Sequence, residues 1–260
     1  MLDAYKLKWI AIVAMFCAHM VIAWWEIIPA WLRYPMYGVG GAAFPVLAYF
    51  VVEGYRHTSS LRRYLLRLLV FGVLAAPFHI VATSIPIGGG HPLAYPWLNI
   101  MFAIMTGLVV LVLYDRIKSR LVFWLLYILV IVPVALLLLE WYVMGVTTVL
   151  LFHIIKPEGL RRVLVPVVAG AGWLMASFAH TLVPYEILAG DYGPLIVNPD
   201  FIRMMPTFAV GCVVAAFLLR RYNGQRGRGN KWLFYVIYPL HFMVLAAVAL
   251  VFGLVELNFF

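Results

Sequence analysis

Charged residues are scarce in this sequence. Only 11% of its 260 residues are Asp, Glu, Lys or Arg, whereas 66% are hydrophobic, and the mean hydropathy is +1.01. A chain with so few charged side chains cannot cover a soluble globule with polar surface, so the expected solvent is lipid.

Cysteines and catalytic sequence motifs are scarce too. The two cysteines, Cys17 and Cys212, lie inside apolar runs, so they offer neither a disulfide framework nor the ligand spacing of a metal site. The sequence contains no G-x-S-x-G elbow, Walker loop or H-E-x-x-H motif, which leaves hydrolase, ATPase and metalloprotease functions without support. We therefore expect no bound metal.

Long apolar stretches dominate what is present. A helix needs about 20 residues to span about 30 Å of hydrocarbon. Nine stretches approach that length, near residues 9–26, 37–54, 63–84, 98–114, 121–139, 142–155, 163–184, 205–221 and 232–256. The sixth is short and fits either a re-entrant or a half-buried helix. No linker or repeat divides the chain, so it predicts an all-α, polytopic transmembrane helix bundle of about nine spans in a single domain, 1–260.

The lysines and arginines are distributed unevenly along these spans. With the N-terminus in the cytoplasm, all of the 19 lysines and arginines except Arg33 and Arg203 fall on the cytoplasmic side. The positive-inside rule therefore predicts a cytoplasmic N-terminus. The net charge of +9 then reports topology, and no nucleic-acid partner is expected.

Ionisable side chains at membrane depth are costly and mark candidate functional sites. His19 and His241 fall near the centres of their predicted helices, about 15 Å from the helix start at 1.5 Å per residue. Desolvation keeps an imidazole neutral, and a neutral imidazole can act as a general base. The alternative is a core histidine that hydrogen-bonds to a neighbouring helix.

Further candidates lie where helices meet the cytoplasm. Glu53 ends the second span, where it either solvates the helix end, orients a histidine or holds a cation. Arg62 and Arg63 open the third span, and Arg67 follows one turn later on the face of Arg63. Guanidinium groups suit the phosphates of a nucleotide-bearing donor such as coenzyme A. Alternatively, Arg62 and Arg63 only snorkel and set the topology.

Five short motifs follow one another in a familiar order. They are Lys8-Trp9-Ile10-Ala11 leading to His19; Ala43-Phe44-Pro45 followed by Glu53-Gly54-Tyr55-Arg56-His57-Thr58; Tyr64-Leu65-Leu66-Arg67-Leu68; Leu98-Asn99-Ile100 with Gly107; and Phe234-Tyr235-Val236-Ile237-Tyr238-Pro239-Leu240-His241. With this order on a nine-helix chain, the sequence resembles the TraX family of membrane acetyltransferases, named for the protein that N-acetylates pilin in conjugative plasmids. The Arg62-Arg63 pair also looks like the wider group of multi-span acyltransferases.

Two positions depart from the family pattern. Ala18 stands where the family usually has Asp, and Gly41 stands where it usually has Arg. Losing both members of an intramembrane ion pair costs less than losing one, because no buried charge is left alone. Either that pair was structural, or His19 has another orienting group such as Glu53 or a tyrosine, or the activity is altered.

The resemblance implies an acyltransferase of the bacterial cytoplasmic (inner) membrane, with acetyl-CoA as donor and a pilin, glycan, lipid or peptide as acceptor. Arg62, Arg63, Arg67, His57 and Asn99 are the candidate donor-binding residues. His19, His241 and Glu53 are the candidate catalytic residues: His19 would deprotonate the acceptor, and His241 or Asn99 would stabilise the oxyanion.

Two other functions stay open. A transporter or flippase would use the histidines as a proton relay, although no Gly/Pro-broken segments occur in matching halves of the chain. A non-catalytic partner in pilus or secretion assembly would fit the loss of the family's charges at Ala18 and Gly41.

Overall fold

The computed structural model describes residues 1–25, 27–83, 98–136, 141–182, 203–229 and 231–253. Within these ranges the chain is helical and forms no β-sheet, which confirms the predicted all-α class for this part of the chain. The helices are α1 (Ala4–Ala23), α2 (Ala30–Gly40), α3 (Ala43–His57), α4 (Leu61–Thr83), α5 (Ile100–Arg116), α6 (Arg120–Leu136), α7 (Tyr142–Ile154), α8 (Glu158–Leu182), α11 (Thr207–Arg220) and α12 (Lys231–Val251).

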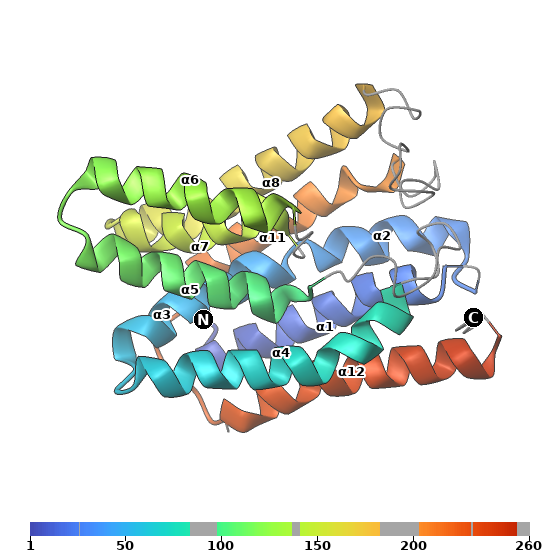
Figure 1. Ribbon diagram of the computed structural model, residues 1–260. Helices are drawn as coiled ribbons and strands as arrows, with labels where there is room; N and C mark the ends of the chain where they lie inside the picture. Colours follow the sequence, from blue (N-terminus) through green and yellow to red (C-terminus); the bar gives the residue numbers. More distant parts are fainter. Residues whose placement is uncertain (26, 84–97, 137–140, 183–202, 230, 254–260) are drawn as a thin grey trace.

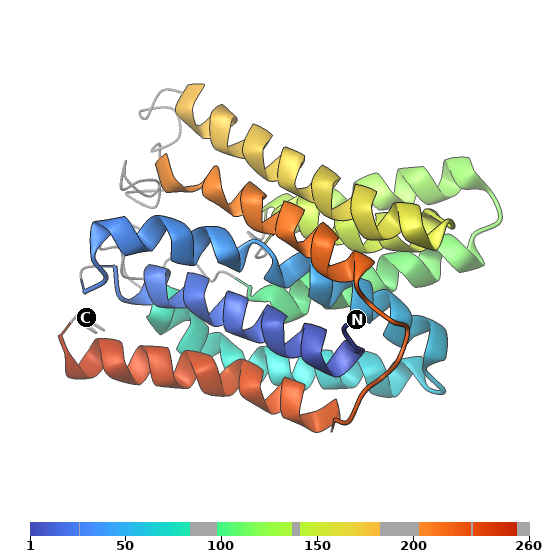
Figure 2. The same ribbon diagram turned by 180° about the vertical axis from the view of Figure 1, so that it is seen from behind.

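The helices lie side by side in an elongated bundle (Figures 1 and 2). α3 is central: it contacts α1, α5, α7, α8 and α11, and nearly all of its side chains from Ala43 to Val52 are buried. α4 packs on α12 along one edge of the bundle, and α8 packs on α11 along another. The central position of α3 explains why its sequence reads as apolar on every face.

The connections that carry or adjoin lysines and arginines gather at one end of the bundle. We call this the basic end; it carries the N-terminus and the connections at 58–60, 117–119, 155–157 and 221–229 (Figure 1). The grouping agrees with the charge distribution on which the topology prediction rests. The cytoplasmic placement of this end stays a prediction.

Five stretches are long and apolar enough to cross a bilayer: Ala4–Ala23, Ala30–His57, Leu61–Thr83, Glu158–Phe178 and Trp232–Val251. α7 has only 13 residues, a rise of about 20 Å, so the predicted short sixth segment is confirmed. Large apolar side chains on α4, α6 and α12 are exposed, which suits contact with lipid. The count of nine spans stays a prediction.

The second predicted span, near 37–54, lies inside the stretch Ala30–His57, but the prediction of one continuous helix is wrong, because α2 and α3 meet at Gly41 and Ala42. Pro45 has no N–H to donate to the carbonyl of Gly41, four residues earlier, so a continuous helix loses a bond there. The thiol of Cys212 on α11 donates to that carbonyl at 3.3 Å. A Cβ at Gly41 would lie 1.9 Å from the carbonyl oxygen of Phe208, so this approach of α11 requires glycine.

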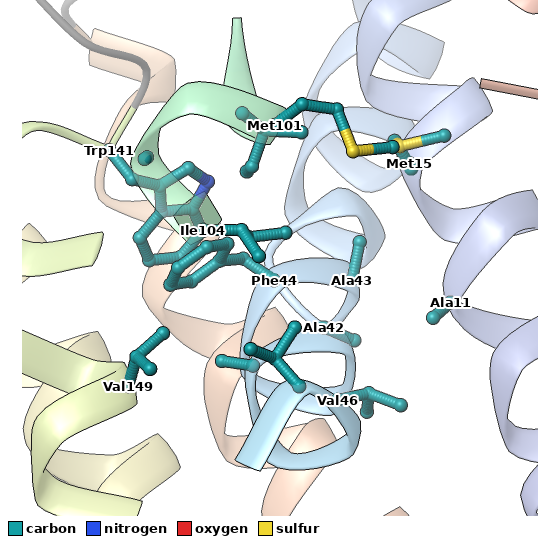
Figure 3. Packing of buried hydrophobic residues seen from close by; sticks show 14 of the residues in the cluster. Ala11, Met15, Ala42, Ala43, Phe44, Val46, Met101, Ile104, Trp141 and Val149 are labelled. Atoms are coloured by element: carbon teal, nitrogen blue, oxygen red, sulfur yellow. The ribbon is translucent and has the colours of Figure 1, made fainter. Parts of the chain in front are cut away.

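Figure 3 shows the core beside α3. On one side, Phe44 stacks on Trp141 with ring centroids 4.4 Å apart. On the other side, Met15 of α1 and Met101 of α5 point toward each other. Both methionines line the cavity of the candidate site.

Candidate functional site

His19 and His241 lie against each other inside the bundle. Nδ1 of His19 is 3.0 Å from Nε2 of His241, and the two rings stack with an interplanar angle of 19°. Each residue is only 6% exposed. The two histidines that the sequence placed at membrane depth therefore form one pair, contributed by the first and last helices.

Both helices position the pair away from the basic end. α1 begins at Ala4, five residues before the predicted start at Trp9, because Asp3 caps it by accepting a hydrogen bond from the Lys6 N–H at 2.8 Å. His241 is the middle residue of α12, which runs from Lys231 to Val251. The central place in the helix that we predicted is therefore confirmed for His241 and wrong for His19, which lies four residues before the end of α1 at Ala23 because that helix starts earlier.

The hydrogen bonds of the pair indicate where its protons lie when both rings are neutral. Nδ1 of His241 is 3.3 Å from the carbonyl oxygen of Ile237, which can only accept, so this Nδ1 carries the hydrogen. A neutral imidazole has one N–H and one lone pair, so Nε2 of His241 accepts from Nδ1 of His19. The basic lone pair of His19 is then on its Nε2.

A third imidazole lies beside the pair. The ring centroid of Phe242 is 4.6 Å from that of His19, 4.0 Å from that of His241 and 4.8 Å from that of His79 on α4. His79 is buried. Sequence reasoning did not select it, because only the packing of α4 on α12 brings it to this place.

A cavity of about 640 Å³ leads from the basic end toward the pair. Its size is within the range of about 300–1,000 Å³ that is typical of small-molecule sites. On α1, Lys8, Ile12 and Met15 line it at helical spacing, and His19 is one turn further on the same face.

α12 continues toward the pair in the same way. Ile237 and Tyr238 line the inner end of the cavity, and His241 follows after one turn. The ring of Tyr238 is 5.3 Å from that of His241. Three or four residues of helix rise about 5–6 Å, so the pair lies just beyond the inner end, behind Met15 and Met101.

The predicted site residues separate into two groups. Glu53, His57 and Arg67 line the cavity near the basic end. Arg62 and Arg63 are exposed at the start of α4 and are not among its lining residues, which agrees with their alternative role in setting the topology.

Asn99 does not line the cavity either. Its side-chain oxygen accepts a hydrogen bond from the Met101 N–H at 3.2 Å and thereby caps α5. Its side-chain nitrogen donates to the carbonyl of Gly72 on α4 at 2.8 Å. Asn99 therefore fastens α5 to α4, and its role toward a donor or an oxyanion stays a prediction.

The carboxylate of Glu53 is held by two arginines. Nη2 of the buried Arg161 on α8 donates to it at 3.0 Å, and Nη1 of Arg56 donates at 3.1 Å. Glu53 thus takes the cation-holding one of its predicted roles and joins α3 to α8, while His241 is the group that contacts His19. A catalytic role for Glu53 stays a prediction.

Sequence reasoning missed two cations at the mouth of the cavity, Lys8 and Arg226. Both were interpreted only as topology signals. Arg226 belongs to the connection between α11 and α12, and only the folded chain brings that connection over α1. The one sequence signal for it was the mixture of glycine and arginine from Gly224 to Gly229.

A separate polar cluster ties α3, α5 and α7 together at the basic end. Nε2 of His153 is 2.8 Å from one oxygen of Asp115, and the hydroxyl of Tyr55 donates to the other at 2.9 Å. Asp115 directly follows the predicted fourth span. Its partial burial raises the pKa of the carboxyl, but the hydrogen bonds from His153 and Tyr55 outweigh this and hold the pKa below its usual value.

Comparison with known proteins supplies the remaining information. The sequence model of the family described as "TraX protein" matches residues 4–249. A relative from Dichelobacter nodosus, named "Probable fimbrial assembly protein FimC, serogroup H1", is 26% identical over 251 residues, which cover 94% of this chain and 95% of the relative. No solved structure matches the chain.

Proposed function

Because this chain belongs to the TraX family, we propose that it is a membrane-embedded acetyltransferase that moves an acetyl group from cytosolic acetyl-CoA to an amine or hydroxyl acceptor. The observation that carries the proposal is the buried pair of His19 and His241 just beyond the inner end of a cavity with a cationic mouth. That arrangement suits a long donor whose charged end stays at the surface while its reactive end goes deep.

The proposed reaction uses Nε2 of His19 as the general base. The acceptor nitrogen or oxygen forms a bond to the thioester carbonyl carbon while Nε2 of His19 takes the acceptor's proton. The carbon–sulfur bond then breaks, and the departing coenzyme A thiolate receives that proton from His19, so the base is restored. Positioning of the two reactants in one buried site supplies much of the rate enhancement.

His241 orients His19 in this scheme. By accepting from Nδ1 of His19, it fixes the ring that must present Nε2 to the acceptor. A base shielded by Phe242, Met15 and Met101 also keeps bulk water from competing with the acceptor for the thioester.

The acceptor is proposed from the relative's name. A fimbrial assembly role for that relative fits a pilin subunit as the acceptor. We propose the bacterial cytoplasmic membrane as the location of this chain, with the basic end in the cytoplasm, because the lysines and arginines gather at that end.

The test is transfer of labelled acetyl from acetyl-CoA to an added acceptor peptide by the purified, full-length protein. His19→Ala should reduce transfer by at least about 100-fold, the lower range for loss of a general base. His153→Gln is the matched control, because it changes a buried histidine outside the cavity and retains a donor to Asp115. Transfer by His19→Ala at the rate of the control would remove His19 from the mechanism.

The relative's name also favours a second function, that of a non-catalytic partner in fimbrial assembly. In that case the protein would not bind acetyl-CoA. Deletion of the chain would still abolish fimbriae, and expression of the His19→Ala variant in the deletion strain would restore them fully. Direct measurement of acetyl-CoA binding separates the two functions.

A further inference from the structure

We propose that Lys8, Arg67 and Arg226 form one phosphate-binding site at the mouth of the cavity. The identification of its ligand as the nucleotide end of coenzyme A rests on the proposed function. The preference for a phosphate-bearing anion rests on the geometry of the three cations.

The three cations come from three separate elements. Lys8 lies on α1, Arg67 on α4 and Arg226 in the connection before α12, and all three line the same cavity. None of them forms a salt bridge with any described residue, and Nε of Arg67 is buried without a hydrogen-bond partner there. Like charges around one cavity repel each other, and a buried guanidinium N–H without an acceptor is costly, so a bound anion would stabilise the arrangement.

The acid at the mouth does not neutralise them. Glu53 lines the cavity, but its carboxylate is already bound by Arg161 and Arg56. The mouth therefore keeps an excess of positive charge, which a group with several negative charges would match. A nucleotide with more than one phosphate has that property.

The connection that carries Arg226 is held in place by backbone hydrogen bonds to the N-terminal segment. The N–H of Leu2 donates to the carbonyl of Arg221 at 2.8 Å, and the N–H of Ala4 donates to the carbonyl of Gln225 at 2.9 Å. Gly227 has a φ of +70°, and a Cβ there would lie 2.7 Å from the carboxylate of Asp3. The connection is therefore fixed against the N-terminal segment and holds Arg226 at the mouth.

The walls beside the cations are aromatic. The ammonium of Lys8 is 5.0 Å from the ring centre of Phe50 and 5.4 Å from that of Phe234. The guanidinium of Arg67 is 5.6 Å from the ring centre of Tyr64 and 5.7 Å from that of Tyr235. Aromatic faces among cations are suited to stacking with a nucleobase, which favours a nucleotide over a phospholipid headgroup.

The experiment measures equilibrium binding to the full-length protein in nanodiscs of zwitterionic lipid. The probes are coenzyme A, dephospho-coenzyme A, which lacks the 3′-phosphate, and pantetheine, which lacks all phosphates. Arg226→Ala and Lys8→Ala should each weaken coenzyme A binding at least about tenfold, as expected for loss of a charged hydrogen bond, and leave pantetheine binding unchanged. Arg228→Ala is the matched control, because Arg228 belongs to the same connection but is not among the residues that line the cavity. Arg226→Lys, which keeps the charge, should retain most of the affinity.

Two results would overturn the site: unchanged coenzyme A binding by Arg226→Ala, or an equal loss of pantetheine binding, which would indicate a structural defect. Loss of coenzyme A binding when the protein is placed in nanodiscs that contain phosphatidylglycerol, together with equal affinities for coenzyme A and dephospho-coenzyme A, would assign the cations to a lipid headgroup. That result would overturn the nucleotide assignment. The site and the enzymatic function fail separately. Charge-dependent binding without acetyl transfer would sink the function alone, and transfer with an unaltered KM in Arg226→Ala would sink the site alone.

Discussion

A Cβ added to Gly40 would lie 2.3 Å from the Cβ of Ala18, so α1 and α2 touch at the residue that directly precedes His19. The contact leaves no room for larger side chains. The two small residues thus let α1 pack closely on α2, and this packing fixes the position of His19 along the bundle relative to His241.

Ala18→Asp, which restores the acid that the family usually carries, should destabilise this chain. The new carboxylate would be buried without a cation, at a cost of about 3–5 kcal/mol. Adding Gly41→Arg should not rescue it, because a side chain at Gly41 would meet the backbone of Phe208 at 1.9 Å. Thermal unfolding of the single and double variants tests this, with Ala18→Ser as the small-residue control. Recovery of the wild-type Tm by the double variant would contradict it.

Replacement of His241 should depend on whether the new side chain accepts a hydrogen bond. Gln can offer an oxygen to Nδ1 of His19, whereas Leu cannot, so His241→Gln should retain transfer activity about tenfold or more above His241→Leu. The loss should appear in kcat, with KM for acetyl-CoA little changed, because His241 does not line the cavity. Equal activity of the two variants would show that the hydrogen bond does not orient the base.

Arg161→Ala should destabilise the protein far more than Arg56→Ala. Both arginines bind Glu53, but the side chain of Arg161 is only 4% exposed, against 28% for Arg56. Breaking a buried pair costs about 3–5 kcal/mol, whereas a surface pair contributes about 0–1 kcal/mol. Since Glu53 is itself partly exposed, we expect about 3 kcal/mol for Arg161→Ala. Chemical denaturation measures both, and similar losses would be evidence against a structural role of the Arg161 pair.

The cluster of Asp115, His153 and Tyr55 predicts an acid dependence of stability. The pKa of the Asp115 carboxyl is held below its usual value in the folded protein, so its contribution is present above the unfolded-state pKa and is lost as the pH falls below about 4. Asp115→Asn removes this group, so its Tm should fall less steeply over that range. Parallel Tm profiles of wild type and Asp115→Asn would refute the prediction.

Much of the fold can be predicted from the sequence, because a segment that crosses lipid must be a helix of about 20 mostly apolar residues. Every predicted span overlaps a described helix, and the errors in their bounds have local causes. Asp3 starts α1 early, and Pro45 divides the second span at Gly41. The predicted five-motif resemblance is confirmed by the family match.

The site was harder to predict, because its residues come together only through packing. The predicted position inside an apolar helix singled out His19 and His241, which the structure brings into contact. Position in the sequence was not sufficient to separate Arg67, which lines the cavity, from Arg62 and Arg63, which do not. Lys8 and Arg226 are far apart in the sequence, and their common location depends on backbone bonds between the N-terminal segment and residues 221–225.

The side chains at the inner end of the cavity also decide whether protons can cross the membrane through the histidine pair. In the bacterial cytoplasmic membrane that we propose for this chain, a histidine pair in contact with water on both faces would conduct protons and dissipate the proton gradient. Met15, Met101 and Tyr238 line the cavity next to the imidazoles, so they separate the pair from the cavity until a thioester that reaches His19 displaces them.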